Sequence, residues 1–427
     1  MKKFAKMSLV AAVAVAGMTS ANAASLTEAI KGVEISGMAR YRFDDINATT
    51  TIGGVKSNVT TANDQLNDYD VEVNAVVPVN DITTFNAKID IAANLTDSTG
   101  DAKANIQLED AYFTFKLPYA TIMAGKQDIP GPMVDDAEGT GIVALVPVGD
   151  MFTFAAGYFN NHDVTSGGVA TTVANAQGTV QYIDPDWLDG KDAIEAAILA
   201  SLGPVNAELW YADVEDALDG YSLKLAGSLG PVNISFMHTD LEVDSHIQNA
   251  TVPLTVGAAA PIFGADNDAE LTKLDLDATF GMFTVKAGYA VTGDNNDFGL
   301  NRVSIDNATG DAASEWFFEQ IEIGDDSDAS AYYLGGEVAI DKYTFGLTYA
   351  NSDSDERAVD TTTLPFNYMV KAADEEKEEI LVEAAYQMSS NFKISSYYSM
   401  YERELKTFGA TAKQESDKFR IELKYSF

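Results

Sequence analysis

The chain has 427 residues and no cysteine, which excludes disulfide bonds and thiolate metal sites. Its 65 acidic residues against 27 lysines and arginines give a formal net charge of -38. This balance argues against a nucleic-acid-binding protein and predicts a negative potential that attracts cations.

The first 23 residues have the organisation of a cleaved export signal. A basic start with three lysines precedes an apolar core over residues 9–16, and Ala21-Asn22-Ala23 supplies the small-x-small cleavage pattern. A membrane anchor would need about 20 apolar residues, and this core is much shorter. We therefore predict a signal peptide over residues 1–23 and one mature domain over residues 24–427.

Polar and apolar residues alternate through successive segments of the mature chain. In the first segment, the polar face carries Glu34, Ser36, Arg40 and Arg42, opposite Ile35, Ala39, Tyr41 and Phe43. A period of two is typical of β-strands with one face toward water. Such strands occur both in exported soluble β-proteins and in outer-membrane barrels, so this pattern leaves both classes open.

Short and long connections alternate between these segments. We predict tight turns near 79–82, 117–119, 149–150, 202–204, 229–231, 280–282, 340–342 and 389–391. Longer polar segments lie near 44–65, 96–105, 128–141, 160–191, 213–218, 241–270, 293–329, 352–376 and 402–416. This order favours an all-β, up-and-down antiparallel transmembrane barrel of about 18 strands, with short periplasmic turns and long extracellular loops.

The third long connection, 128–141, is the candidate constriction loop. A barrel of this size leaves an aqueous channel that an inward loop would narrow. The glycines and prolines of this connection suit a compact bend. Its carboxylates are Asp128, Asp135, Asp136 and Glu138. We interpret them as residues that select for cations. The alternative is that this is an ordinary solvated acidic loop.

The last segment, 419–427, alternates strictly and ends on an aromatic residue. Tyr425 and Phe427, following an export signal, resemble the assembly signal of outer-membrane proteins, so we expect the barrel assembly machinery to be a partner. Closure of the barrel pairs the first and last strands. We therefore predict a basic pore wall that comprises Arg40, Arg42, Lys418, Arg420 and Lys424. This wall would set a transverse electric field across the pore. The alternative is that its arginines pair locally with acids such as Glu422.

Two blocks of sequence resemble the major outer membrane porin family of epsilonproteobacteria, the Campylobacter-type major outer membrane proteins. One is the mature start, 26–37, followed by Arg40-Tyr41-Arg42. The other is 122–127, with Asp135 and Gly139-Thr140-Gly141 after it. The resemblance implies an eighteen-stranded barrel, a homotrimer and a cation-preferring diffusion pore, in some members with calcium near the constriction.

We predict no cofactor other than weakly bound Ca2+ at the acidic loops, and we predict no catalytic activity. The segment 184–192 superficially resembles a calcium loop, but Asp189 stands where glycine is needed. The metal site is therefore left unassigned. The three histidines, His162, His238 and His246, form no recognisable arrangement with a nucleophile, so we do not expect an enzyme.

These patterns predict a multi-pass outer-membrane porin whose water-filled channel passes ions and small hydrophilic solutes by diffusion. One alternative is a substrate-specific channel, which would need a track of lumenal aromatic residues. Aromatic residues in the inward phase are scattered: Tyr112, Phe159, Trp210, Tyr333 and Tyr397. The other alternative is an adhesin whose barrel is plugged.

Overall fold

The computed structural model describes most of the chain from residue 32 onward. The described ranges are 32–52, 54–58, 65–96, 104–133, 137–162, 173–174, 180–181, 191–216, 218–243, 251–253, 259–261, 268–293, 319–321, 323, 326–359, 370–407 and 410–427. The predicted signal peptide lies outside them. Within them, no helix is long and apolar enough to cross a membrane.

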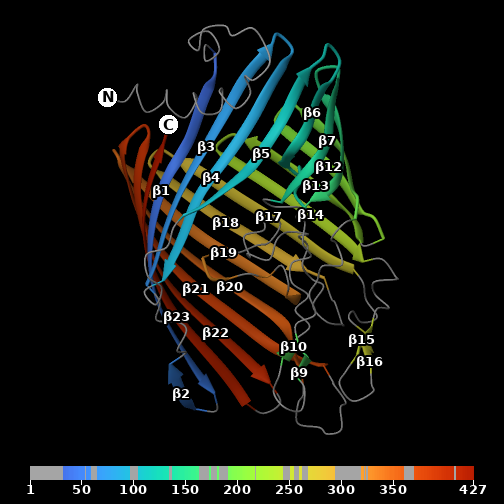
Figure 1. Cartoon of the computed structure of the whole chain (residues 1–427). Helices are drawn as coiled ribbons and strands as arrows, with labels where there is room; N and C mark the ends of the chain where they lie inside the picture. The colour runs from blue at the N-terminus through green and yellow to red at the C-terminus, as the bar shows by residue number, and fades with distance from the viewer. Residues whose placement is uncertain are drawn as a thin grey trace.

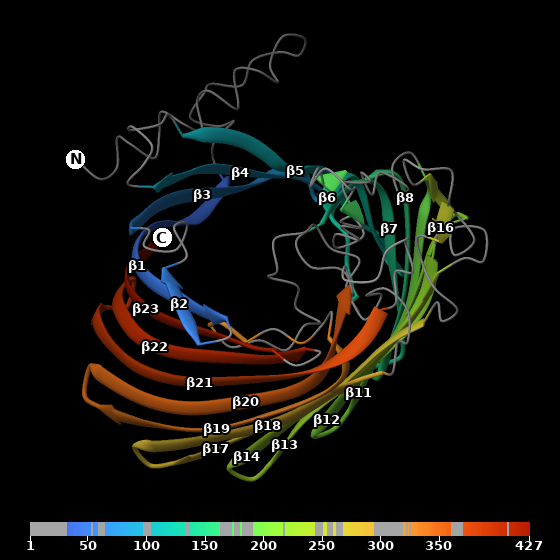
Figure 2. The same ribbon diagram turned by 90° about the horizontal axis from the view of Figure 1, so that it is seen from below.

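Eighteen strands form a closed antiparallel barrel, which confirms the predicted fold (Figures 1 and 2). In order around the barrel they are β1 (Glu34–Ile52), β3 (Gln65–Asn80), β4 (Thr83–Thr96), β5 (Asn105–Lys116), β6 (Thr121–Asp128), β7 (Glu138–Val148), β8 (Phe152–His162), β11 (Ala193–Leu202), β12 (Val205–Val214), β13 (Leu218–Leu229), β14 (Val232–Val243), β17 (Asp268–Phe280), β18 (Phe283–Thr292), β19 (Ser327–Ile340), β20 (Tyr343–Val359), β21 (Val370–Ser389), β22 (Phe392–Thr407) and β23 (Ala410–Ser426). β23 pairs with β1 and closes the ring.

Short extra strands lie at the end of the barrel opposite the tight turns. β2 (Val55–Asn58) folds back on the end of β1, and two small hairpins pair β9 (Val173–Ala174) with β10 (Val180–Gln181) and β15 (Thr251–Pro253) with β16 (Ala259–Pro261). Figure 1 shows these hairpins at the lower end and the carboxy-terminal end of β23 at the upper end. The long connections therefore share one end of the barrel.

All eight predicted tight turns join consecutive barrel strands where expected. Two of these turns contain the same dipeptide, Gly-Pro, and their glycines, Gly203 and Gly230, have φ values of 73° and 64°. This is the left-handed region, which glycine adopts without a steric penalty. The turn chemistry in the sequence thus sets the periplasmic boundary of these two hairpins.

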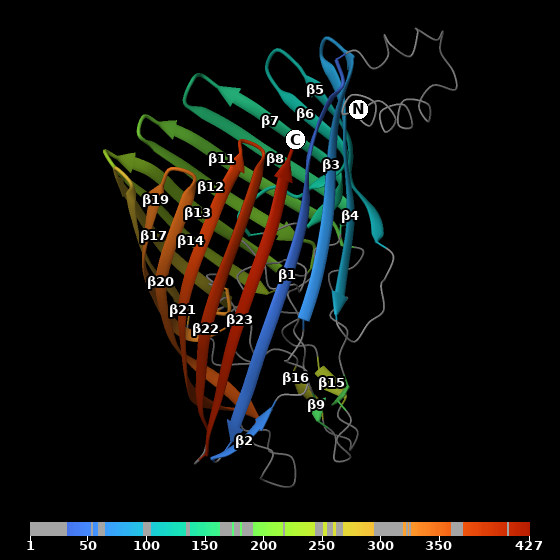
Figure 3. The ribbon, with the colours of Figure 1, turned by 90° about the vertical axis from the view of Figure 1, so that its left-hand side faces the viewer.

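Three of the predicted long loops are wrong in length because the strands continue through them. β1 extends to Ile52, β20 and β21 leave only 360–369 between them, and β22 and β23 are separated by 408–409 alone. These outer strand ends are polar on both faces, so their composition is that of loops although the hydrogen-bonded ladder continues. Figure 3 shows β1 and β21–β23 as the long strands of this side.

The outward phase of each strand supplies the apolar belt. On β20, Tyr343, Phe345 and Leu347 are about half exposed, as expected for side chains that face lipid. Beyond Tyr349 the same phase becomes polar, and Asp353 is exposed. The extracellular edge of the belt on this wall therefore lies near Tyr349, and the strand ends beyond it project outside the membrane.

Candidate functional site

Closure brings the predicted basic residues together on one lumenal wall. The register of β1 with β23 places Arg40 opposite Lys424 and Arg42 opposite Glu422, and Arg420 lies opposite Asp44. The alternate residues of the two strands, including the exposed Tyr41 and Tyr425, face outward. Lys418 is two positions before Arg420 and shares its phase.

The arginines of this wall are paired with carboxylates. Arg40 lies 3.1 Å from Asp70 and 3.4 Å from Asp68. Arg42 donates to Glu422 at 3.1 Å, which is the local pairing that the sequence had left as the alternative. Arg40 and Arg42 thus each have a carboxylate within ion-pair distance.

A segment of the connection between β18 and β19 lies against the same wall. Glu319 accepts from Lys418 at 2.6 Å and lies 3.5 Å from Arg420. The backbone N–H of Gln320 donates to Glu379 at 3.0 Å, and its side-chain amide donates to Ser399 at 2.7 Å. A loop that the sequence treated only as polar is thus joined to β21, β22 and β23 inside the barrel.

Apolar and ionic contacts hold the rest of this segment. Ile321 and Ile323 are almost fully buried, and Asp326 accepts from Lys377 at 2.6 Å. Lys377 lies on β21 beyond the apolar belt, 3.3 Å from Glu375. Burial alone would lower the pKa of the Lys377 ammonium, but the Asp326 and Glu375 carboxylates raise that pKa above its ordinary value.

Sequence reasoning missed this inward segment, which we call the 319–326 segment and of which residues 319–321, 323 and 326 are described. Its one available signal was the spacing of Ile321 and Ile323, two apolar residues in alternate positions within a long acidic connection. Alternation over so few residues is too short to distinguish a buried stretch from chance. Its contacts with β21, β22 and β23 come from residues at least 50 positions away in the sequence, and the Thr292 hydroxyl of β18, 34 positions away, donates to the Asp326 carbonyl.

The described residues of the third long connection, 129–133 and 137, also lie inside the barrel and are held by apolar contacts. Ile129, Met133 and Ala137 are buried in one cluster with Phe159 of β8 and Trp210 of β12. At Gly131 a Cβ atom would lie 3.2 Å from the Trp210 ring. This connection therefore packs closely against the wall formed by β7, β8, β11 and β12.

The four carboxylates predicted on this connection do not share one environment. Asp128 and Glu138 lie opposite each other at the ends of β6 and β7, and Glu138 forms an ion pair with Lys126. They follow the phase of Ile142, which is 54% exposed on the outer face. Asp135 and Asp136 lie outside the described residues.

An acidic wall lines the lumen on β3, β4 and β5. Its carboxylates are Asp68, Asp70, Glu72, Asp90, Glu109 and Asp110, and its cations are Lys88 on β4 and Arg40 on the neighbouring β1. Lys88 pairs with Glu109 at 2.9 Å. One buried oxygen each of Asp70, Asp90 and Asp110 has no hydrogen-bond partner among the described residues. Carboxylates thus exceed cations on this wall.

The lumenal aromatic residues are engaged in separate contacts. Phe159 and Trp210 anchor the third connection, Tyr333 donates to Asp275 at 2.9 Å, and the Arg420 guanidinium lies 5.3 Å from the centre of the Tyr397 ring. These four side chains lie on four different strands, β8, β12, β19 and β22, so among the described residues they do not form one continuous aromatic track.

The carboxy-terminal residue is held in the barrel ladder. Its backbone N–H donates to the Gly37 carbonyl, and its carbonyl accepts from the Gly37 N–H, both at 3.0 Å. The Phe427 ring stacks on Tyr425 with 6.0 Å between the ring centres. The predicted assembly signal therefore lies at the seam where the barrel closes.

The described residues offer no calcium site. Among them, no group of three or more His, Asp or Glu side chains is arranged to hold a metal ion. The segment 184–190 and His246 lie outside them. His162 contacts the Lys191 carbonyl at 2.8 Å and His238 contacts the Thr272 hydroxyl at 2.9 Å.

Solved outer-membrane barrels share this architecture. Pseudomonas aeruginosa OpdK with vanillate is 10% identical with a TM-score of 0.59, covering 93% of this chain and 99% of its own. P. aeruginosa OccK3 (OpdO) is 13% identical with a TM-score of 0.58, and the match covers 94% of this chain and 97% of OccK3. Acinetobacter baumannii OccAB1 is 12% identical with a TM-score of 0.59, and the match covers 92% of this chain and 96% of OccAB1. At such low identity the likeness shows the fold alone.

The sequence itself places the chain in a family. No protein with a curated description matches it significantly. The model of the family described as Campylobacter major outer membrane protein matches residues 1–425, nearly the whole chain. The family that the blocks 26–37 and 122–127 resembled is thereby confirmed. The chain is a multi-pass outer-membrane β-barrel channel of the Campylobacter major outer membrane protein family.

Proposed function

We propose that this channel is water-filled, passes ions and small hydrophilic solutes by passive diffusion, and prefers cations. The observation that supports cation preference best is the acidic wall on β3–β5. Asp90 and Asp110 form no ion pair with the described residues, although Lys88 lies opposite Asp110, and with six carboxylates against two cations the wall keeps a net negative charge. A ring or wall of carboxylates in a pore concentrates cations and repels anions.

The proposed narrowing of the pore lies between two inward connections. The third connection covers the wall around Phe159 and Trp210, and the 319–326 segment covers the wall around Ser399. We retain Asp135 and Asp136 as proposed selectivity residues on the third connection. Asp128 and Glu138 receive less weight because their strand phase is that of the outer face.

The test is a reversal potential measured across a planar bilayer under a salt gradient. The variant Asp90→Asn with Asp110→Asn should shift the potential toward zero, because two lumenal charges are removed. The matched control is Asp353→Asn with Glu376→Gln, two facing carboxylates on the exposed outer side of β20 and β21. The control should keep the wild-type potential. Unchanged selectivity in the lumenal variant would contradict cation selection by this wall, and a complete lack of conducting steps would indicate a plugged barrel.

Assembly as a homotrimer and recognition by the barrel assembly machinery remain part of the proposal. The position of Phe427 in the closing seam supports a role in assembly. Weakly bound Ca2+ is proposed only for acidic connections outside the described residues. If chelator leaves both the trimer band on a native gel and its thermal stability unchanged, calcium has no structural role.

A further inference from the structure

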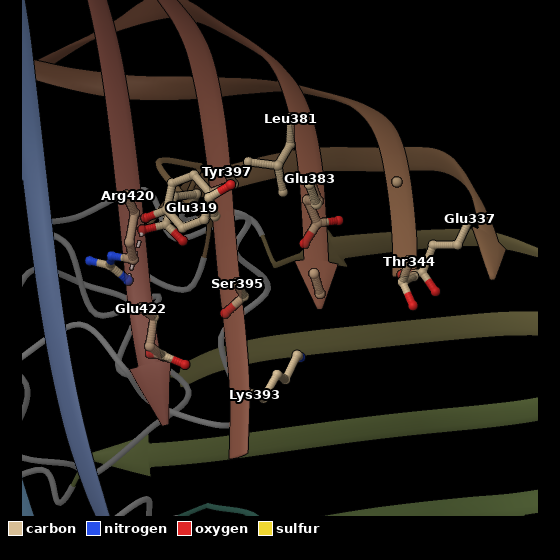
Figure 4. Close-up of a pocket in the computed structure, with 14 residues that line it drawn as sticks. Glu319, Glu337, Thr344, Leu381, Glu383, Lys393, Ser395, Tyr397, Arg420 and Glu422 are labelled. Carbon is tan, nitrogen blue, oxygen red and sulfur yellow. Dashed lines mark ion pairs between the residues drawn. The ribbon is translucent and has the colours of Figure 1, made fainter. Parts of the chain in front are cut away.

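A hollow of about 490 Å3 lies in the lumenal wall formed by β20–β23, beside the 319–326 segment (Figure 4). Its floor is one row of the sheet with short side chains. The strand register places Thr344, Ala385 and Ser395 side by side on β20, β21 and β22. Longer polar side chains stand on both sides of this row, so the hollow follows from the residue sizes along three neighbouring strands.

The row on the extracellular side of the floor is acidic where it borders the hollow. Glu337 of β19, Gly346 of β20 and Glu383 of β21 are successive register partners. Because Gly346 has no side chain, the Glu383 carboxylate lies over this position, with its Oε2 3.1 Å from where a Cβ atom would stand. The row on the periplasmic side is basic, with Lys393 of β22 opposite Lys424 of β23. A solute in the hollow therefore meets negative charge at one end and positive charge at the other.

The charges that line the hollow differ in whether they are already paired. Glu319 is held by Lys418 at 2.6 Å, and Arg420 by Asp44 at 2.5 Å. Glu422 is paired with Arg42 at 3.1 Å, and Glu337 with Lys286 at 2.5 Å.

The remaining two charged groups, Glu383 and Lys393, make no ion pair or side-chain hydrogen bond with the described residues. Glu383 faces Tyr397 across β21 and β22, and Lys393 is four positions before Tyr397 on β22. At about 3.3 Å per residue, their backbones are separated by about 13 Å along the strand. Side chains extended from both ends leave room between them for a small molecule, but not for a direct ion pair without bending toward each other.

We propose that this hollow binds a small zwitterionic amino-carboxylic solute, with its ammonium at Glu383 and its carboxylate at Lys393. This site rests on the proposed diffusion function, because the solute reaches it through the lumen. Ser395 and Thr344 hydroxyls on the floor supply neutral hydrogen-bonding groups. An ammonium alone would leave Lys393 uncompensated, and a carboxylate alone would leave Glu383 uncompensated, so one molecule carrying both charges fits best.

The experiment is block of single-channel current in a planar bilayer by 4-aminobutanoate. Butylammonium and butanoate, each carrying one of its two charges, are the matched probes. The zwitterion should block wild-type current saturably, at a concentration about tenfold lower than either probe, because each charge-assisted contact is worth about one such factor. Glu383→Lys should remove the advantage of the zwitterion, as should Lys393→Glu.

The double variant Glu383→Lys with Lys393→Glu should recover the block, since the zwitterion can bind in the reverse orientation. Glu376→Gln, on the exposed outer side of β21, is the matched control, and 4-aminobutanoate should block its current as it blocks that of the wild type. Equal block by all three probes, or an advantage that survives both single reversals, would overturn the site while leaving the channel. A chain without any conducting steps would instead overturn the proposed function, and the site with it.

Discussion

Arg420 donates two hydrogen bonds of 2.5 Å to the Asp44 carboxylate, joining the last strand of the barrel to the first across 376 positions of sequence. The pair lies in the closing seam, with the two side chains 16% and 7% exposed. A bidentate arginine–carboxylate pair combines charge with fixed geometry. This contact therefore contributes to barrel closure as well as to the charge of the lumen.

Asp44→Ala should lower the free energy of unfolding by about 1–3 kcal/mol, because the Arg420 guanidinium loses its principal acceptor. Urea titration of the purified barrel, followed by the gel shift between folded and unfolded forms, measures this change. Glu415→Gln is the control: its partners Lys413 and Lys56 are 3.4 and 3.6 Å away, and the Glu415 side chain is about half exposed. That variant should change stability by less than about 1 kcal/mol. Equal effects of the two substitutions would contradict a special role for the seam pair.

Removing the ionic contacts of the 319–326 segment should increase single-channel conductance. Glu319→Ala with Asp326→Ala removes the ion pairs of this segment with Lys418, Arg420 and Lys377. Without these ion pairs the segment should no longer be held in the position where it narrows the pore. Glu404→Ala, a carboxylate on the outer strand end of β22, serves as the control because it should leave conductance unchanged. Wild-type conductance in the double variant would show that the segment does not restrict the current.

The carboxylates of the third connection should separate into two functional pairs. Asp135→Asn with Asp136→Asn should reduce cation preference in the reversal potential. Asp128→Asn with Glu138→Gln should have a smaller effect, since these residues follow the outward phase and Glu138 is paired with Lys126. A larger shift from the second pair would mean that position on the strand does not determine access to the lumen here.

Truncation of Trp210 should release the third connection from the wall. Trp210→Ala removes the ring that contacts Gly131 and leaves a cavity in the apolar cluster, with a cost of about 3–5 kcal/mol. We expect lower thermal stability together with larger conductance. Tyr211→Ala, the next residue but 44% exposed on the outer face, is the matched control for loss of an aromatic ring. If both variants conduct alike, the third connection does not depend on Trp210.

Loss of the terminal residue should reduce assembly more than loss of its ring. Deleting Phe427 removes both ladder hydrogen bonds to Gly37, whereas Phe427→Ala keeps them and loses only the stacking on Tyr425. The amount of folded barrel in isolated outer membranes, judged by its gel shift, should fall in the order wild type, Phe427→Ala, deletion. A deletion that assembles as well as wild type would contradict the assembly signal.

The sequence by itself determined the strands, their outward faces and the tight turns. Alternation with a period of two is a local property, so Tyr41 and Arg42 already indicate opposite faces without any knowledge of neighbouring strands. The Gly-Pro turns at Gly203 and Gly230 likewise depend only on local backbone conformation. The two matching blocks, 26–37 and 122–127, pointed to the correct family for the same reason, because each is a continuous stretch of sequence.

Only the tertiary structure decided which charges meet. The pairing of Arg420 with Asp44 depends on the register in which β23 closes on β1, and no local pattern specifies that register. Burial of Ile321 and Ile323 likewise depends on contacts with distant strands. The outer ends of β22 and β23 could not be recognised as strands from the sequence, because both of their faces are polar. The physical reason is that a residue's strand phase is encoded by its immediate neighbours, whereas its partners on other strands and connections are set by closure of the whole barrel.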